Sequence, residues 1–306
     1  MTVGLSLTTG DGLTGRFELL RALASLCETP QPSHDAILAA LGLPCRPLPE
    51  DHTAVFVLQC HPYASFYLNS DGMLGGETGD RVAGFWRALG LVPPAEPDHL
   101  SALLGLYAAL GIDEIEGAHS AGTRSGLDHA RETLLWEHLA SWVPAFLAAV
   151  TDLGASPFQG WAELLGEALV AEAERARPPA QLPLALRQAP DPPRLGPGLP
   201  VALDAALTPA CSGVVLTRAS LTAGAREIGV GARQGERRFM IRAMLDQDAT
   251  GTLGWLAKEA NRWAGLHRLW MPEGVGIGEW WSERAASTAA LFVALAGAPD
   301  WHEVRR

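Results

Sequence analysis

Two acid–histidine pairs in the sequence could do chemistry. Asp98 and His99 lie in E-P-D-H-L-S-A-L, and Glu137 and His138 lie in L-L-W-E-H-L-A-S-W-V-P. A carboxylate beside an imidazole can serve as acid and base, can bind a metal ion, or can hold a cationic ligand. The elements that position each pair decide among these uses.

The second pair is separated by the geometry of its own helix. Four residues recur at i, i+3, i+4 and i+7 and share one helix face: Leu135, His138, Leu139 and Trp142. We therefore expect His138 to face the core. Glu137 should point elsewhere, because neighbours in a helix do not face each other.

The first pair stands where a helix is expected to begin. Pro97 suits the first helical position, and Asp98 in the first turn complements the positive end of the helix dipole. This placement accounts for an aspartate at position 98 without any catalytic or ligand-binding role. An enzyme or nucleotide-dependent factor that uses Asp98 and His99 as acid and base remains an alternative.

Composition favours an all-α fold. The chain has 306 residues, of which 48% are hydrophobic and 19% charged, and Leu and Ala dominate over β-branched residues. Prolines interrupt residues 177–200, so we expect a linker or extended arm there. The predicted organisation is a helical domain over 1–176, this linker, and a helical extension over 201–306.

Helical spacing and stop signals predict the main elements. Residues 61–76 are expected to form a structured loop, because Pro62 interrupts any helix and N-S-D-G is a turn. Helices are expected over 16–26, from Ser33 to Gly42, up to Gly90, from Pro97, over 124–152 with a break near Pro144, from Pro157, and over 218–229, 235–263 with a break, and 279–296.

Charge and hydropathy narrow the class of partner. No apolar run is long enough for a membrane span, and the N-terminus does not resemble a secretory signal, so we expect a cytoplasmic protein without stable membrane insertion. The net charge is −11, made up of −13 over residues 1–186 and +2 over 187–306. This balance disfavours nucleic acid and suits a basic partner.

Other chemical motifs are weak. The histidines show no H-x-x-x-H or H-E-x-x-H spacing and the cysteines no C-x-x-C, so no metal site is expected. The sequence contains no G-x-S-x-G nucleophile motif and no P-loop. Residues 216–231 loosely resemble a helix-turn-helix, but the tail is not strongly basic, so a DNA-binding regulator is the least favoured alternative.

Four stretches in order resemble the TorD/DmsD family of cytoplasmic chaperones for molybdenum-containing oxidoreductases. They are R-F-E-L-L-R-A-L-A-S-L-C; H-P-Y-A-S-F-Y-L-N-S-D-G-M-L-G-G; E-P-D-H-L-S-A-L-L; and L-L-W-E-H-L-A-S-W-V-P-A-F-L with S-P-F-Q-G-W-A-E-L. The resemblance covers residues 16–175. It implies an all-helical, TorD-like bundle and a role other than catalysis.

The resemblance also implies a partner. Members bind the twin-arginine leader of a precursor and hold the apoenzyme until its molybdopterin cofactor is inserted. The implied partners are the catalytic subunit of a molybdopterin oxidoreductase and its leader, bound by a monomer or a domain-swapped dimer. The resemblance implies no tightly bound cofactor. It implies at most a transient contact with the molybdopterin cofactor or GTP.

The family's motifs place the leader-binding residues. The E-P-x-D-H-type motif falls on Glu96, Pro97, Asp98 and His99, without the extra residue. The aromatic-x-x-Leu-Phe motif falls on His52, Val55 and Phe56, with His52 in place of the aromatic residue. The better-matching P-Y-A-S-F-Y adds Pro62, Tyr63, Phe66 and Tyr67. A carboxylate for the guanidinium groups beside an aromatic groove would suit such a leader.

Overall fold

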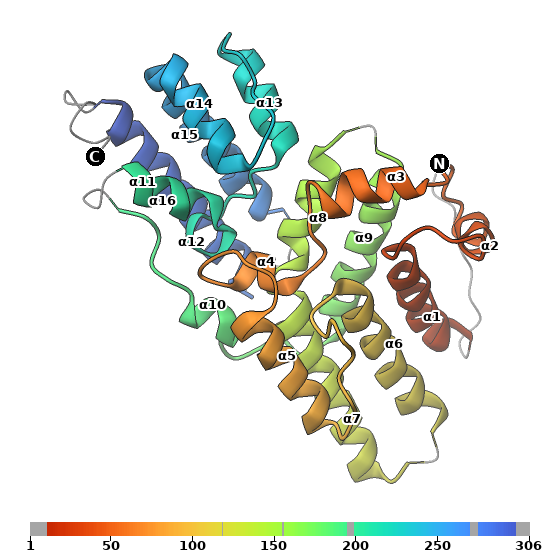
Figure 1. Cartoon of the computed structure of the whole chain (residues 1–306). Helices are drawn as coiled ribbons and strands as arrows, with labels where there is room; N and C mark the ends of the chain where they lie inside the picture. Colours follow the sequence, from red (N-terminus) through yellow and green to blue (C-terminus); the bar gives the residue numbers. More distant parts are fainter. Residues whose placement is uncertain (1–10, 118, 155, 195–198, 270–274, 298–306) are drawn as a thin grey trace.

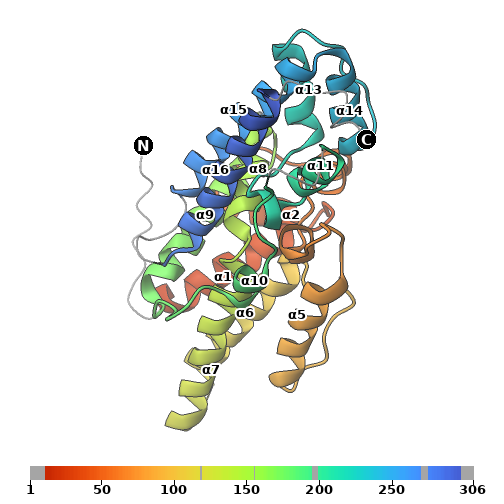
Figure 2. The same cartoon turned by 90° about the vertical axis from the view of Figure 1, so that its left-hand side faces the viewer.

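The computed structural model describes residues 11–117, 119–154, 156–194, 199–269 and 275–297. Within these residues all regular elements are helical, namely sixteen α-helices and two π-helical segments, η1 and η2. Figures 1 and 2 show helices α13 to α16 gathered at one end of the molecule and α5 and α7 at the other. The expected all-α fold is confirmed, including the helical C-terminal part.

The first part of the chain supplies most of the elements. They are α1 (Asp11–Leu26), α2 (His34–Ala40), α3 (Pro49–His52), η1 (Thr53–Val57), α4 (Ala64–Leu68), α5 (Gly76–Ala88), α6 (Leu100–Glu116), α7 (Ala121–Thr133), η2 (Leu134–Leu139), α8 (Val143–Asp152) and α9 (Gln159–Arg175). The proline-rich segment carries the short α10 (Leu184–Gln188). The rest comprises α11 (Leu199–Leu207), α12 (Pro209–Ser212), α13 (Arg218–Glu227), α14 (Arg237–Gln247), α15 (Ala249–His267) and α16 (Ile277–Ala296).

An aromatic cluster forms the centre of the first part. Tyr67 from α4 stacks on Trp142, with ring centroids 5.3 Å apart, and Phe146 from α8 lies against both. Phe56 from η1 and Trp161 from α9 extend the cluster. Aromatic side chains of this size bury enough apolar area to dominate the stability of a helical core.

The C-terminal helices share this core. The Trp281 indole of α16 donates a hydrogen bond of 3.0 Å to the Ser141 carbonyl, and Arg262 of α15 binds both carboxylate oxygens of Asp152 at 2.8 Å. One hydrophobic cluster includes buried residues from both parts. The helices after residue 200 are therefore packed onto the first part rather than tethered to it.

Membrane-spanning character is confined to one bent pair of helices among the described residues. Within the described ranges no single helix has both the length and the apolar composition of a span. One bent pair, Ala121–Leu139 with Val143–Asp152, meets both criteria when taken together, with 49° between its halves.

Candidate functional site

Asp98 fastens two segments that are distant in sequence. Its Oδ2 accepts a 3.0 Å hydrogen bond from the Ser65 backbone N–H, and its carbonyl accepts one of 3.1 Å from Ala64. The Leu100 N–H donates to the Pro62 carbonyl at 2.8 Å. The carboxylate therefore supplies the N-terminal cap of α4, a helix within the stretch that we expected to be a loop. The rest of residues 61–75 is not helical, as expected, and α4 forms within it as a short helix because Asp98 satisfies the free N–H of its first turn.

The start of α6 also differs from the expected one. The helix begins at Leu100, and the His99 Nδ1 accepts a 3.2 Å hydrogen bond from the Ser101 N–H as its cap. Pro97 and Asp98 precede the helix, so the prediction that they form its first turn was wrong. Asp98 and His99 each bond a backbone N–H rather than each other, whereas a catalytic base is normally oriented by its acid.

His99 is neutral in this position. Burial lowers its pKa below the ordinary value, although the nearby Glu96, Glu28 and Asp98 carboxylates act in the opposite direction. A neutral ring leaves Nδ1 free to accept the capping hydrogen bond. Protonation of His99 is therefore displaced to lower pH than for an exposed histidine.

An open cleft of about 470 Å³ lies beside Asp98. It is lined by residues along the length of α5 and by the loop that leads into α6, and Tyr63, Glu96, Pro97 and Asp98 from the expected set contribute to its wall. Asp98 is 3% exposed, yet Oδ1, the oxygen that does not bond Ser65, lies close to the space above a wall glycine, Gly79. A β-carbon at Gly79 would lie 3.8 Å from this oxygen.

The cleft carries an excess of negative charge. Its wall includes Asp80, Glu96 and Asp98 against one guanidinium, that of Arg87. Burial, followed by the hydrogen bond to the Glu96 carboxylate, raises the pKa of Tyr63, so this phenol stays protonated. The result is an acidic cleft, a term used below for this site, that is fitted to a cation.

Exposed apolar residues flank the acidic cleft. Leu74 and Pro93 line it directly, and their chain neighbours Met73 and Val92 are 65% and 89% exposed. Leu91 is also exposed. Exposed apolar groups beside a polar pocket are typical of a surface that receives a peptide.

Several expected leader-binding residues are in the core instead. Phe56 is 2% exposed, Phe66 4% and Tyr67 0%, and Pro62 is buried. These side chains do not line an open groove in this structure, which corrects the expectation for them. They are buried because α8, α9 and the C-terminal helices pack over them, and the local sequence carries no sign of that packing.

His52 and His99 lie outside the acidic cleft. His52 packs edge-on to Phe56, with ring centroids 5.3 Å apart. His99 lines a neighbouring open cleft of about 580 Å³ with Glu28, Trp86 and, from the shared loop, Glu96. Only part of the expected set is therefore brought together.

Sequence reasoning missed the opposite wall of the cleft. Gly75, Gly76, Gly79 and Asp80 all come from G-G-E-T-G-D. Gly75 and Gly76 have φ of 78° and 61°, conformations that favour glycine. The sequence feature that could have predicted this wall is the group of three glycines and one acid at a helix start, because glycines leave the backbone accessible to a ligand.

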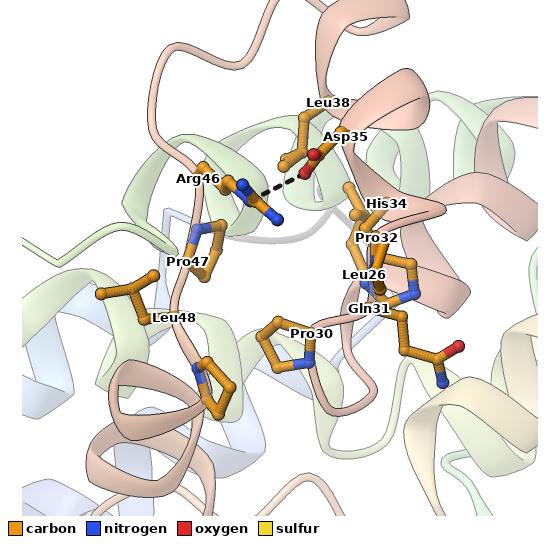
Figure 3. A pocket seen from close by; sticks show the side chains of 11 residues that line it. Leu26, Pro30, Gln31, Pro32, His34, Asp35, Leu38, Arg46, Pro47 and Leu48 are labelled. Carbon is orange, nitrogen blue, oxygen red and sulfur yellow. Dashed lines mark ion pairs between the residues drawn. The ribbon is translucent and has the colours of Figure 1, made fainter.

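A smaller cavity of about 130 Å³ lies between α2 and the segment before α3 (Figure 3). Prolines line much of it, including Pro30, Pro32 and Pro47. Its acid, Asp35, is paired with Arg46 at 2.8 Å. Its carboxylate is therefore less available to a cationic ligand than the carboxylates of the acidic cleft are.

The second acid–histidine pair is separated as expected. His138 is 7% exposed and packs against Phe85, with ring centroids 5.0 Å apart. Glu137 points elsewhere and accepts a 2.6 Å hydrogen bond from the Leu184 N–H of the proline-rich segment. The prediction of a core-facing His138 is confirmed.

Two buried histidines should make stability depend on pH. Burial, with Arg81 nearby, lowers the pKa of His138 to about 4, and burial lowers that of His267 to about 4. Between pH 6.5 and 4 the unfolded chain then binds more protons, so the free energy of unfolding falls as pH falls. We expect a loss of about 3 kcal/mol per histidine, measured by urea denaturation across this range.

The variant His267→Gln separates the contribution of His267 to this pH dependence from that of the carboxylates. The His267 ring lies 2.7 Å from the Gly213 carbonyl, and the His267→Gln amide can donate to the same oxygen without titrating. Its stability should fall less steeply below pH 6.5 than that of the wild type. Parallel slopes would show that His267 does not titrate in this range.

The remaining alternatives find little support. Within the part of the chain that the structure describes, no three His, Cys, Asp or Glu side chains cluster as metal ligands. Residues 216–231 contain one helix, α13, and α14 begins only at Arg237. A helix-turn-helix needs its second helix after a turn of about three or four residues, so this segment does not form one.

Comparison with known proteins identifies one region. Residues 22–148, which include both walls of the acidic cleft, match the family model described as nitrate reductase delta subunit. This family serves as chaperones for molybdoenzyme maturation, so the resemblance noted from the sequence motifs is confirmed over that region. No curated protein matches the chain.

Proposed function

Because residues 22–148 match the nitrate reductase delta subunit family, we propose that this protein is a cytoplasmic assembly chaperone that binds the twin-arginine leader of a molybdopterin oxidoreductase. In this proposal it holds the apo form until the cofactor is inserted and the enzyme is exported. The chaperone itself needs no tightly bound cofactor for this role.

The acidic cleft carries the proposal. A guanidinium ion pairs with carboxylate oxygens, and Asp98 Oδ1 lies beside a residue without a side chain, Gly79, in the wall of this open cleft. Glu96 and Asp80 add charge for a second guanidinium. The Asp98 carboxylate is held in place by the Ser65 N–H, so little conformational entropy is lost on binding.

The apolar border fits the rest of a leader. Such a leader continues from its arginines into an apolar helix, which needs an apolar surface next to the charged pocket. Leu74, Met73 and Val92 provide that surface at the mouth of the cleft. Charged and apolar groups are therefore both available at this site, as the leader requires.

Gly79→Ala tests the cleft with opposite effects on stability and binding. Alanine favours helix over glycine by about 1 kcal/mol, and its β-carbon, at 3.8 Å from Asp98, would fit without a clash. The folded state should be stabilised. Leader binding should weaken about tenfold or more, because the methyl group occupies the approach to Oδ1. Calorimetric titration with a leader peptide and thermal unfolding measure the two effects.

Gly84→Ala is the matched control. Gly84 lies on the same helix, is exposed, and has no neighbouring atom within 4 Å of an added β-carbon. This variant should gain similar stability and keep the wild-type affinity. Equal affinity of both variants would exclude the acidic cleft as the place where the arginines bind.

A further inference from the structure

Four polar side chains with basic or donor groups meet where the C-terminal helices cover the first part of the chain. The Phe66 ring is at the centre, with the Arg237 guanidinium carbon 5.0 Å from its centroid. The His61 and Tyr67 rings lie 4.8 and 5.1 Å from the same ring. Arg218 lies close enough to repel both Arg237 and His61. We call these residues the arginine cluster: His61, Tyr67, Arg218 and Arg237.

Arg237 carries a charge that no carboxylate in the described residues is seen to neutralise. One of its nitrogens, Nη1, donates to the Leu216 carbonyl at 3.0 Å, and the Phe66 ring face attracts the guanidinium without offsetting its charge. The nearby Asp152 is bound by Arg262 on both oxygens. Guanidinium groups taken out of water are normally paired, as the buried Arg131 is here with Glu114.

The hydroxyl of Tyr67 has no hydrogen-bond partner in the described part of the chain, although the residue is 0% exposed. Buried hydroxyl groups almost always have a partner. Burial raises the pKa of this hydroxyl, and the charge of the nearby Arg237 acts in the opposite direction. The Tyr67 hydroxyl, which lacks an acceptor, and the Arg237 guanidinium, which lacks a carboxylate partner among the described residues, are therefore both open to an anion.

The like charges of the cluster repel each other. Burial, with Arg237 as the next largest cause, lowers the pKa of His61, and burial lowers that of Arg237, to which the charge of Arg218 adds. The net charge of the chain is −11. A local excess of positive charge, from two arginines without a carboxylate partner among the described residues, therefore contrasts with the charge of the chain as a whole. A bound anion would relieve this repulsion.

We propose that the arginine cluster binds the phosphate group of a small phosphorylated molecule at the junction between α4 and the C-terminal helices. Two guanidinium groups match the two negative charges of a phosphate monoester, and their planar forks match its oxygens. The Tyr67 hydroxyl supplies a further donor. Phosphate is favoured over carboxylate because a carboxylate would balance only one of the two arginines.

Inorganic phosphate is the probe for this site. Calorimetric titration of the full chain at constant ionic strength should show saturable binding to one site. Arg218→Gln and Arg237→Gln should each weaken it about tenfold or more, because each removes a charge-assisted contact. Arg226→Gln on α13 and Arg242→Gln on α14, both exposed, should bind as the wild type does. Absence of saturable binding at about 10 mM phosphate, or equal loss in all four variants, would overturn the proposal.

Tyr67→Phe gives a second test that does not depend on the arginine variants folding. In phosphate-free buffer its melting temperature should equal or exceed that of the wild type, because the substitution removes a hydroxyl that lacks a partner. Its affinity for phosphate should fall. A lower melting temperature without phosphate, or an unchanged affinity, would show that the hydroxyl is not waiting for an anion. The cluster shares no residue with the acidic cleft, so this result is independent of leader binding.

Discussion

Asp98→Asn is expected to weaken the binding of a twin-arginine leader peptide by about 1.5 to 3 kcal/mol while leaving the fold largely intact. The loss arises because the amide keeps the shape of the side chain but removes the charge that a guanidinium requires. The amide oxygen can still accept the hydrogen bond from the Ser65 N–H, so α4 keeps its cap. Calorimetry with the peptide and urea denaturation of the variant measure both quantities.

Asp98→Ala provides the contrast. It removes the charge and the hydrogen bond together and leaves a buried Ser65 N–H without this partner, which costs about 1 to 3 kcal/mol of stability. We therefore expect both variants to lose affinity, but only alanine to lose substantial stability. An asparagine variant that binds the leader as the wild type does would remove Asp98 from the recognition site.

Gly213→Ala should produce the largest loss of stability. Gly213 ends α12 with φ of 68°, and a β-carbon there would lie 2.5 Å from the backbone of both Trp281 and Ala285 in α16. Backbone atoms cannot move aside as a side chain can, so α12 and α16 must separate. Overpacking and left-handed strain together should cost about 3 kcal/mol or more, measured by chemical denaturation.

Gly229→Ala is the control for the strain alone. Gly229 has a similar φ of 75°, but nothing lies within 4 Å of an added β-carbon. We expect a loss of about 1 to 2 kcal/mol there. Trp281, whose indole bonds the Ser141 carbonyl, should also change its fluorescence in the Gly213 variant only. Equal losses in both variants would show that α12 does not pack closely on α16.

The sequence predicted the features that depend on local spacing. The helices around 218–229 and 279–296 are present as α13 and α16, and His138 faces the core because its position follows from helical periodicity. The prolines of 177–200 also marked a segment whose described residues hold the short α10 and the first two residues of α11. These properties are set by residues within a few positions of one another.

The features that sequence reasoning missed depend on distant partners. Asp98 caps a helix 33 residues earlier in the chain, which a pattern around 98 does not reveal. Phe66 and Tyr67 follow a proline in an apparent loop, and their burial depends on α8 and on Arg237 of the C-terminal helices. His99 acts as a cap although histidine is an uncommon cap, so its role could not be read from helix signals.

The most direct measurement of the central claim is a calorimetric titration of the unaltered protein with a leader peptide and with the same peptide carrying Ala-Ala in place of Arg-Arg. We expect micromolar binding of the first peptide and a loss of at least about 100-fold for the second, because the acidic cleft recognises guanidinium groups. Equal affinity for both peptides, or no binding of either, would contradict leader recognition by this protein.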